Sequence, residues 1–250
     1  MKDMTIFEDE TLEDLQADGF YLIQKKQNFR FGMDAVLLAD FAIICPQDTV
    51  ADFGSGTGIL PLLLAIRGKG KKYTCIEIQE EMAEMSKRTM AINHLEEKVN
   101  IICSDIADIP EILPQCSFEA VICNPPYGMP GKVMVNQEEC LATARHQRKN
   151  TLHQFFTSAF HILKGKGKLF LVYPAAQMFS LMTELHRAHL EPKRFRLVYP
   201  DINHSANLVL MEAVKDARPL LHPMPPLIIC NEDGGLTNEL KSIYHMDKQT

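Results

Sequence analysis

The hydrophobic pattern of this chain alternates between two kinds of segment. Short apolar runs predict buried strands, and longer segments between them carry apolar residues at helical spacing. Strands that alternate with helices predict a parallel sheet, because a parallel connection requires a crossover. The predicted strands are residues 49–53, 72–78, 99–103, 118–123, 168–173, 194–199 and 207–214, and the predicted helices are residues 33–44, 58–67, 79–93, 152–163 (ended by Gly165) and 175–189.

The last two predicted strands break this alternation. Residues 200–206 between them are too few for a helical crossover, so we expect 207–214 to pair antiparallel with its predecessor. The pattern as a whole predicts an α/β fold. We expect a doubly wound, mostly parallel seven-stranded sheet whose last strand is antiparallel, with a short N-terminal hairpin extension.

The two ends of the chain differ from the middle. Residues 19–31 hold two short strand-like runs that predict the hairpin, and Asp34 is placed to cap the next helix. The last 36 residues contain four prolines and are expected to wrap around the domain. We therefore expect an extension at 1–32, a domain at 33–214 and a C-terminal tail at 215–250 packed on that domain.

Composition narrows the class of protein. Of the 250 residues, 46% are hydrophobic and 23% are charged, which is typical of a globular protein in water. No apolar run approaches the roughly 18 residues of a membrane span, and the start lacks the pattern of a signal peptide. The seven cysteines never form a C-x-x-C pair, so neither disulfides nor a zinc site is predicted. We expect a cytoplasmic protein without a metal ion, a membrane partner or an obligate protein partner.

The charge distribution leaves a polyanionic partner open. A formal net charge of −6 weakly disfavours a nucleic-acid binder. Basic side chains nevertheless cluster at residues 25–26, 145–149, 164–168 and 193–196, and local patches set the field that a polyanion meets.

A glycine-rich loop follows the first predicted strand of the sheet, in the order Asp52-Phe53-Gly54-Ser55-Gly56-Thr57-Gly58. Alternate glycines allow a tight turn that a ligand can approach closely, although a purely structural turn would need them too. A dinucleotide loop would have its third glycine at position 59, where this chain has isoleucine. Asp52 is also poorly placed beside a pyrophosphate. It suits a cationic ligand, such as the amino group and sulfonium of S-adenosylmethionine.

The next two strands end in acidic residues at the same edge. Glu77 is placed to accept the hydroxyl groups of a ribose, and Asp105 to accept from an adenine amino group. A single acidic residue after a strand is more often a helix cap. Three of them after three successive strands are harder to assign to capping.

The fourth predicted strand ends in Asn124-Pro125-Pro126-Tyr127. Two prolines cannot continue a ladder, so the tetrapeptide forms a stiff turn at the carboxyl edge of the sheet. The Asn124 side chain and the Pro125 carbonyl can accept the two hydrogens of an NH₂ group, while Tyr127 offers a stacking surface. These groups suit a planar base or amide, and a proline-rich turn without a ligand is the alternative.

This ordered set resembles the class I S-adenosylmethionine-dependent methyltransferases, and specifically those that methylate a planar amino nitrogen. The closer resemblance is to bacterial tRNA (adenine-N6) methyltransferases that act on valine tRNA next to the anticodon. It is carried by residues 29–38, 190–194 and 206–210 besides the motifs above. The chain departs from these relatives at Tyr173-Pro174-Ala175, where many have His-Arg-Pro, so an arginine contact to RNA is not expected there.

The resemblance implies a Rossmann-like fold and roles for individual residues. It implies a cofactor site, for S-adenosylmethionine, formed by Asp34, Asp52, Gly54, Ser55, Gly56, Thr57, Gly58, Glu77, Ile78, Asp105, Ile106 and Asn124. It implies methyl transfer to adenine N6, with residues 124–127 holding the base. The anticodon loop of tRNA is the expected partner, and its candidate contacts are Phe29, Arg30, Arg145, His146, Arg148, Lys149, Lys193 and Arg194.

Other functions remain open from the sequence. The same tetrapeptide would serve a ribosomal RNA guanine-N2 or a protein-glutamine methyltransferase. A nicotinamide-dependent oxidoreductase is disfavoured by Asp52 and by isoleucine at position 59. A non-catalytic RNA-binding module is disfavoured by the complete 124–127 set.

Overall fold

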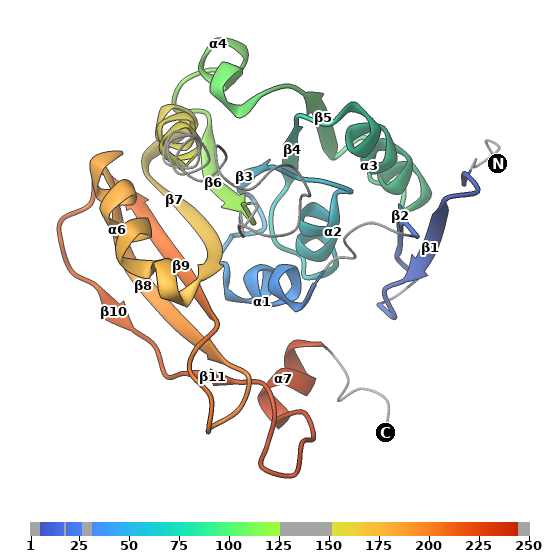
Figure 1. The fold of residues 1–250 in the computed structure, drawn as a ribbon. Coiled ribbons are helices and arrows are strands. Elements are labelled where there is room, and N and C mark those ends of the chain that lie inside the picture. The colour runs from blue at the N-terminus through green and yellow to red at the C-terminus, as the bar shows by residue number, and fades with distance from the viewer. Residues whose placement is uncertain (1–5, 18, 27–31, 126–151, 245–250) are drawn as a thin grey trace, which may run out of the picture.

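The structure is a computed structural model, and it describes residues 6–17, 19–26, 32–125 and 152–244. Its centre is a nine-stranded sheet in the order β10-β8-β9-β7-β6-β3-β4-β5, with β11 also paired to β8 (Figure 1). The strands of this sheet are β3 (Thr49–Phe53), β4 (Lys72–Glu77), β5 (Val99–Cys103), β6 (Phe118–Cys123), β7 (Leu163–Pro174), β8 (Leu190–Tyr199), β9 (Leu208–Lys215), β10 (His222–Pro223) and β11 (Leu227–Ile228).

The pairing follows the predicted topology. Strands β3 to β7 pair parallel, and β9 lies antiparallel between β7 and β8. The doubly wound fold and its antiparallel last long strand are therefore confirmed. The predicted number of seven strands is wrong, because the tail adds β10 and β11, two residues each, alongside β8.

Helices cover both faces of the sheet. They are α1 (Met33–Phe41), α2 (Ile59–Ile66), α3 (Glu80–Ile92), α4 (Ile109–Ile112), a helix over residues 152–162, α6 (Met178–Arg187) and α7 (Asn238–Ile243), with short 3₁₀ turns η1 (Ile106–Asp108) and η2 (Ala175–Gln177).

Alternate residues of each strand enter two separate cores. In β6, Ala120 and Ile122 pack with α1 and α2, whereas Val121 and Cys123 pack with α6 and the helix over 152–162. Both faces are apolar, as a parallel sheet covered on two sides requires.

The boundary between the helix over 152–162 and β7 differs from the prediction. The helix passes directly into β7, so Gly165 lies inside the strand and does not end the helix. The Lys215 ammonium, from the neighbouring β9, donates to the carbonyls of Phe160 and Leu163 at 2.6 and 2.8 Å. These bonds occupy carbonyls at the helix end, which replaces the glycine cap that the sequence suggests.

The N-terminal hairpin lies earlier in the chain than predicted. Its strands are β1 (Glu10–Asp14) and β2 (Tyr21–Lys25), while residues 27–31 lie outside the described part. The hairpin docks on α3 (Figure 1), where Arg88 binds the buried Glu10 carboxylate at 2.7 Å. The Asn93 side chain exchanges two hydrogen bonds with the backbone of Tyr21. Propensity alone did not find β1, because its sequence is mostly acidic.

The first helix also begins differently. Its N-cap residue is Gly32, and the predicted cap Asp34 lies inside the first turn without capping it. At the other end of the chain, the tail runs along β8 and returns to α1. At the end of α2, the Arg67 guanidinium donates to the Ile243 carbonyl of α7 at 2.9 Å. Among the described helices, none has the length and apolar character needed to cross a bilayer.

Candidate active site

The chain reverses the order of its strands between β3 and β6. From β3 the sheet continues through β4 to β5 on one side, and the chain then returns to form β6 and β7 on the other. In open α/β sheets, ligands bind outside the carboxyl ends of the strands at such a switch point. Phe53 pairs with Cys123 in the register, so Gly54 and Asn124 are the first residues beyond the two strands.

The glycine loop turns sharply from β3 into α2. Gly54, Gly56 and Gly58 have φ angles of 71°, 53° and 85°, which are unfavourable for other residues. At Gly58 a side chain is excluded for a second reason, since a Cβ atom would lie 2.5 Å from Ser86 Oγ on α3. The predicted tight turn is present, and α3 lies directly against it.

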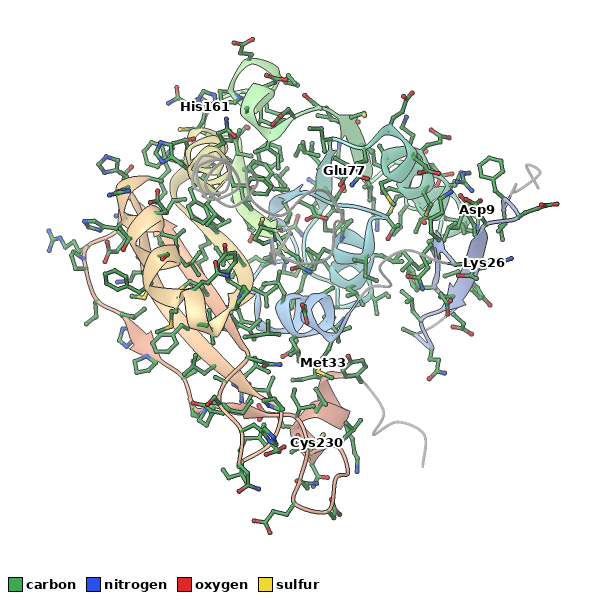
Figure 2. All side chains as sticks on the ribbon, in the orientation of Figure 1. Asp9, Lys26, Met33, Glu77, His161 and Cys230 are labelled. Atoms are coloured by element: carbon green, nitrogen blue, oxygen red, sulfur yellow. The ribbon has the colours of Figure 1, made fainter. Side chains whose placement is uncertain are left out.

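Glu77 connects this loop to the next one. The side chain is 5% exposed and its two oxygens accept from two backbone N–H groups, Gly56 at 2.8 Å and Gln79 at 2.9 Å. In Figure 2 Glu77 lies in the interior of the molecule, well away from Asp9 and Lys26 of the hairpin. One carboxylate thus holds the glycine loop and the start of α3 together.

Asp52 is the most unusual side chain at this edge. It is 1% exposed, and neither of its carboxylate oxygens has a hydrogen-bond partner among the described residues. Burial raises the pKa of this carboxyl well above its ordinary value, and the neighbouring Glu77 carboxylate raises the pKa further. A buried carboxylate normally has a partner, so an unpaired one at a switch point indicates a place for a donor or cation supplied by a ligand.

Sequence reasoning gave no role to the two thiols that lie beside Asp52. Cys75 pairs with Asp52 in the register of β3 and β4, and Cys123 ends β6 on the other side. Burial raises the pKa of both thiols well above the ordinary value, and Asp52 raises it further, so both are neutral at pH 7. Their position opposite the predicted acidic residue was the only available signal.

The remaining predicted cofactor residues occupy varied environments. Asp34 is half-buried on α1, and burial raises its pKa. Asp105 is exposed, and its Oδ1 accepts from Ala107 N at 2.9 Å, so it caps the η1 turn. Ile106 is 7% exposed and packs in the core, whereas Ile78, beside Glu77, is 62% exposed. Ser55 is buried and Thr57 half-buried within the glycine loop.

The predicted catalytic turn is described only in part. Asn124 is half-buried and Pro125 is buried, directly after β6. The position of Asn124 beside the glycine loop follows from the strand register. Pro126, Tyr127, Phe29, Arg30, Arg145, His146, Arg148 and Lys149 lie outside the described residues.

Lys193 and Arg194 lie away from this edge, in the first half of β8. The Arg194 guanidinium donates to Glu212 and to the Phe41 carbonyl, both at 2.9 Å, and its centre lies 4.1 Å from the centroid of the Phe41 ring. Arg194 also lines a cavity of about 160 Å³ between α1, β8 and the tail. The Lys193 ammonium donates to the Arg218 carbonyl at 3.1 Å. Arg194 thus joins β8 to β9 and α1, and Lys193 joins β8 to the tail, which favours structural roles over a role in binding RNA.

Residues 34–193 match the model of the methyltransferase small domain. The chain belongs to this family. The match extends from α1 into β8 and so includes the whole switch point. Within the described residues, no group of three His, Cys, Asp or Glu side chains is arranged to hold a metal ion.

Several relatives of this chain carry the same specific name, "tRNA1(Val) (adenine(37)-N6)-methyltransferase". The protein of that name from a Flavobacteriaceae bacterium (strain 3519-10) is 27% identical over 72% of this chain and 80% of its own length. That from Vibrio campbellii is 26% identical over 82% of this chain and 86% of its own length.

Solved structures share the fold. A predicted O-methyltransferase from Agrobacterium tumefaciens is 22% identical and superposes with a TM-score of 0.68, over 85% of this chain and 96% of its own. The M. jannaschii TYW2 protein in complex with AdoMet is 15% identical, with a TM-score of 0.56 over 84% of this chain and 87% of its own. These similarities show that the chain has a Rossmann-like fold.

Proposed function

We propose that this chain methylates the exocyclic N6 of an adenine in tRNA, adenine 37 of valine tRNA, with S-adenosylmethionine as the methyl donor. The observation that carries the proposal is the switch point itself. A glycine loop follows β3, the buried Asp52 carboxylate of β3 has no partner among the described residues, and Asn124 and Pro125 directly follow the adjacent β6. The names of the relatives supply the choice of nucleic acid and of base.

The residues present fit the proposed cofactor. Asp52 has two buried oxygens without a described partner, which suits a cationic group brought by a ligand. The glycine turn exposes backbone close to the same point, and the nearby Glu77 carboxylate suits ribose hydroxyls. Asp52, Glu77 and residues 54–58 would therefore hold the cofactor, and Ile78 and Asp34 are further candidates for contact with it. When bound, S-adenosylmethionine supplies a methyl group on a sulfonium, ready for direct transfer to a nucleophile.

The chain's own part in the reaction is to position an amine. The Asn124 side-chain oxygen and the Pro125 carbonyl accept the two N6–H hydrogens, which aims the nitrogen lone pair at the methyl group. The nitrogen becomes cationic as it attacks, and both acceptors then bind it more strongly than in the ground state. The cationic product is itself acidic, so no strong general base is needed.

The substrate suits this geometry. An adenine must leave its stack to reach a switch point, and a base in an anticodon loop is less constrained than one in a duplex. Tyr127, the last residue of the tetrapeptide, would stack on the extruded base. Since tRNA is modified where it is made and used, we infer a cytoplasmic enzyme.

The test is a transfer assay with defined substrates. The purified protein is incubated with labelled S-adenosylmethionine and unmodified valine tRNA, a second tRNA, ribosomal RNA or total protein, and the products are digested for nucleoside mass spectrometry. We expect N6-methyladenosine from valine tRNA alone. N2-methylguanosine, or label only in protein, would overturn the proposal. A valine tRNA with guanine at position 37 is the matched control and should remain unlabelled.

A further inference from the structure

The order of the strands divides the carboxyl edge of the sheet into two halves. On one side of the switch point lie the ends of β3, β4 and β5, where the proposed cofactor residues stand. On the other side lie the ends of β6, β7 and β8 and the start of β9. Figure 1 shows α6 and β8 on the opposite side of the molecule from α3 and β5. An RNA whose target base reaches Asn124 therefore has its flanking nucleotides over the second half.

This second half exposes an aromatic ring. Phe179 lies in the first turn of α6 and is 85% exposed. It follows the end of β7 by five residues, and β7 is the strand that pairs with β6. The same helix buries Leu181 and Leu185 against the sheet, so Phe179 points away from the core. Exposing a phenylalanine ring to water costs free energy without a folding benefit.

The adjacent β8–β9 connection, residues 200–207, presents a second apolar side chain. Its carboxylate Asp201 accepts from Asn203 N at 2.8 Å and lies 2.6 Å from His204 Nδ1, which fixes the turn. Ile202, which lies between Asp201 and Asn203 in the sequence, is 61% exposed. This connection is tied to the start of η2, because Ala175 N donates to Asn207 O at 3.0 Å.

The side chains around Phe179 indicate whether a protein or an unpaired base contacts the ring. On the outer face of α6 the next positions are Thr183, whose hydroxyl donates to the Phe179 carbonyl at 2.9 Å, and the exposed His186. Among the described residues, this half of the edge exposes two large hydrophobic side chains, Phe179 and Ile202, whereas a protein interface of ordinary size needs a broad, well-packed surface. A single flat ring suits a single flat partner, and unpaired bases stack on aromatic side chains irrespective of sequence.

We propose that Phe179 is a positioning residue that stacks on an anticodon-loop base next to the target adenine, with Ile202 beside it and His204 facing the RNA backbone. This inference rests on the proposed function. It assigns a contact with RNA to the first turn of α6. Stacking of this kind holds the loop while the target base is extruded, so it acts on tRNA binding and leaves the cofactor site unchanged.

The test uses the full chain and a valine tRNA anticodon stem-loop carrying 2-aminopurine at one of the positions that flank the target. We expect the wild-type protein to change the 2-aminopurine fluorescence on binding, and Phe179→Ala to abolish that change. The KM for tRNA should rise roughly 5- to 100-fold, as loss of one base–aromatic stack predicts. The Kd for S-adenosylhomocysteine should stay within about twofold.

Three further variants make the result specific. Phe179→Tyr keeps a ring and should behave as wild type, whereas Phe179→Leu keeps apolar area only and should resemble alanine. Leu220→Ala removes an exposed apolar side chain (61%) from the tail and should change nothing. Unchanged tRNA binding by Phe179→Ala, in a wild-type protein that methylates tRNA, overturns the inference and leaves the proposed function standing. A change in oligomeric state with unchanged tRNA binding would assign the ring to a protein contact and overturn it too.

Discussion

The two halves of the carboxyl edge of the sheet differ in burial and polarity, and they therefore suit different kinds of ligand. The half formed by β3 and β4 is buried and polar, with the Glu77 carboxylate bound by backbone N–H groups and Asp52 without a partner among the described residues. The half formed by β7 and β8 is open and apolar, with Phe179 and Ile202 largely exposed. A small cationic cofactor can be enclosed, whereas a folded RNA has to be met on a surface.

The largest expected effect comes from the boundary between the halves. Asn124→Ala removes one of the two proposed acceptors of the N6 hydrogens, and loss of one such group costs about 10²- to 10³-fold in transfer rate. Single-turnover kinetics on valine tRNA should show this loss, with little change in the Kd for S-adenosylmethionine. Asn100→Ala, an exposed asparagine on β5, is the matched control. A full rate in Asn124→Ala would remove Asn124 from the mechanism.

The enclosed half should be intolerant of added volume. Gly58→Ala combines a left-handed φ of 85° with a contact of 2.5 Å to Ser86 Oγ. We expect a loss of about 2–4 kcal/mol in the free energy of unfolding, measured by urea denaturation. Gly68→Ala, after the same helix, has a φ of 65° with open space around it and should lose only about 1–2 kcal/mol. Equal losses would show that the approach of α3 is unimportant.

Substitution of Asp52 should have opposite effects on the stability of the ligand-free protein and on its affinity for the ligand. Asp52→Asn removes the charge that the proposed ligand would meet, and we expect a roughly 10- to 100-fold weaker affinity for S-adenosylmethionine by calorimetry. The ligand-free variant should be more stable than wild type at pH 7, because an amide avoids the cost of ionising a buried, unpaired carboxyl. Tighter ligand binding in the variant would contradict the assignment.

The sign of the pH dependence follows from the direction of the pKa shift. Burial raises the pKa of Asp52 in the folded state above 3.8, so its contribution to stability is full below that pH. The contribution is then lost as the pH rises through the folded-state pKa. The difference in melting temperature between Asp52→Asn and wild type should therefore grow from pH 4 upward, and a difference independent of pH would refute the linkage.

The smallest effect concerns the contacts that join β8 to β9 and α1. Arg194→Ala breaks the bonds to Glu212 and the Phe41 carbonyl, and should cost about 1–2 kcal/mol of unfolding free energy. Its KM for tRNA should not change, because the guanidinium faces the protein. Lys193→Ala, whose ammonium binds one exposed carbonyl, is the control for general loss of charge. A large rise in KM with unchanged stability would restore Arg194 as an RNA contact.

Much of the fold was predictable because hydrophobic periodicity and strand length agree with the topology. The runs over 49–53, 99–103 and 118–123 became strands with those same limits. Failures arose where tertiary contacts decide. The acidic strand β1 forms because Arg88 and α3 receive it, and β10 and β11 form because β8 offers an unpaired edge.

The site divides in the same manner. Glycines at positions requiring positive φ, and acidic residues at strand ends, are visible in a sequence because their chemistry is local. The state of Asp52 was not visible in the sequence, since it depends on which described residues surround the carboxylate, and none of them is a hydrogen-bond partner. Phe179 escaped attention because an isolated phenylalanine in an amphipathic helix resembles any other core residue until its exposure is known.

The Glu77 carboxylate has a consequence for the history of the sequence. It reaches a donor on each side, Gly56 N in one loop and Gln79 N in the next, and the shorter side chain of aspartate is not expected to reach both. Both donors are backbone N–H groups, which every residue except proline keeps, so the constraint falls on the side chain at position 77 before any ligand arrives. In more distant relatives we therefore expect glutamate to persist at this position even where the residues that donate to it change.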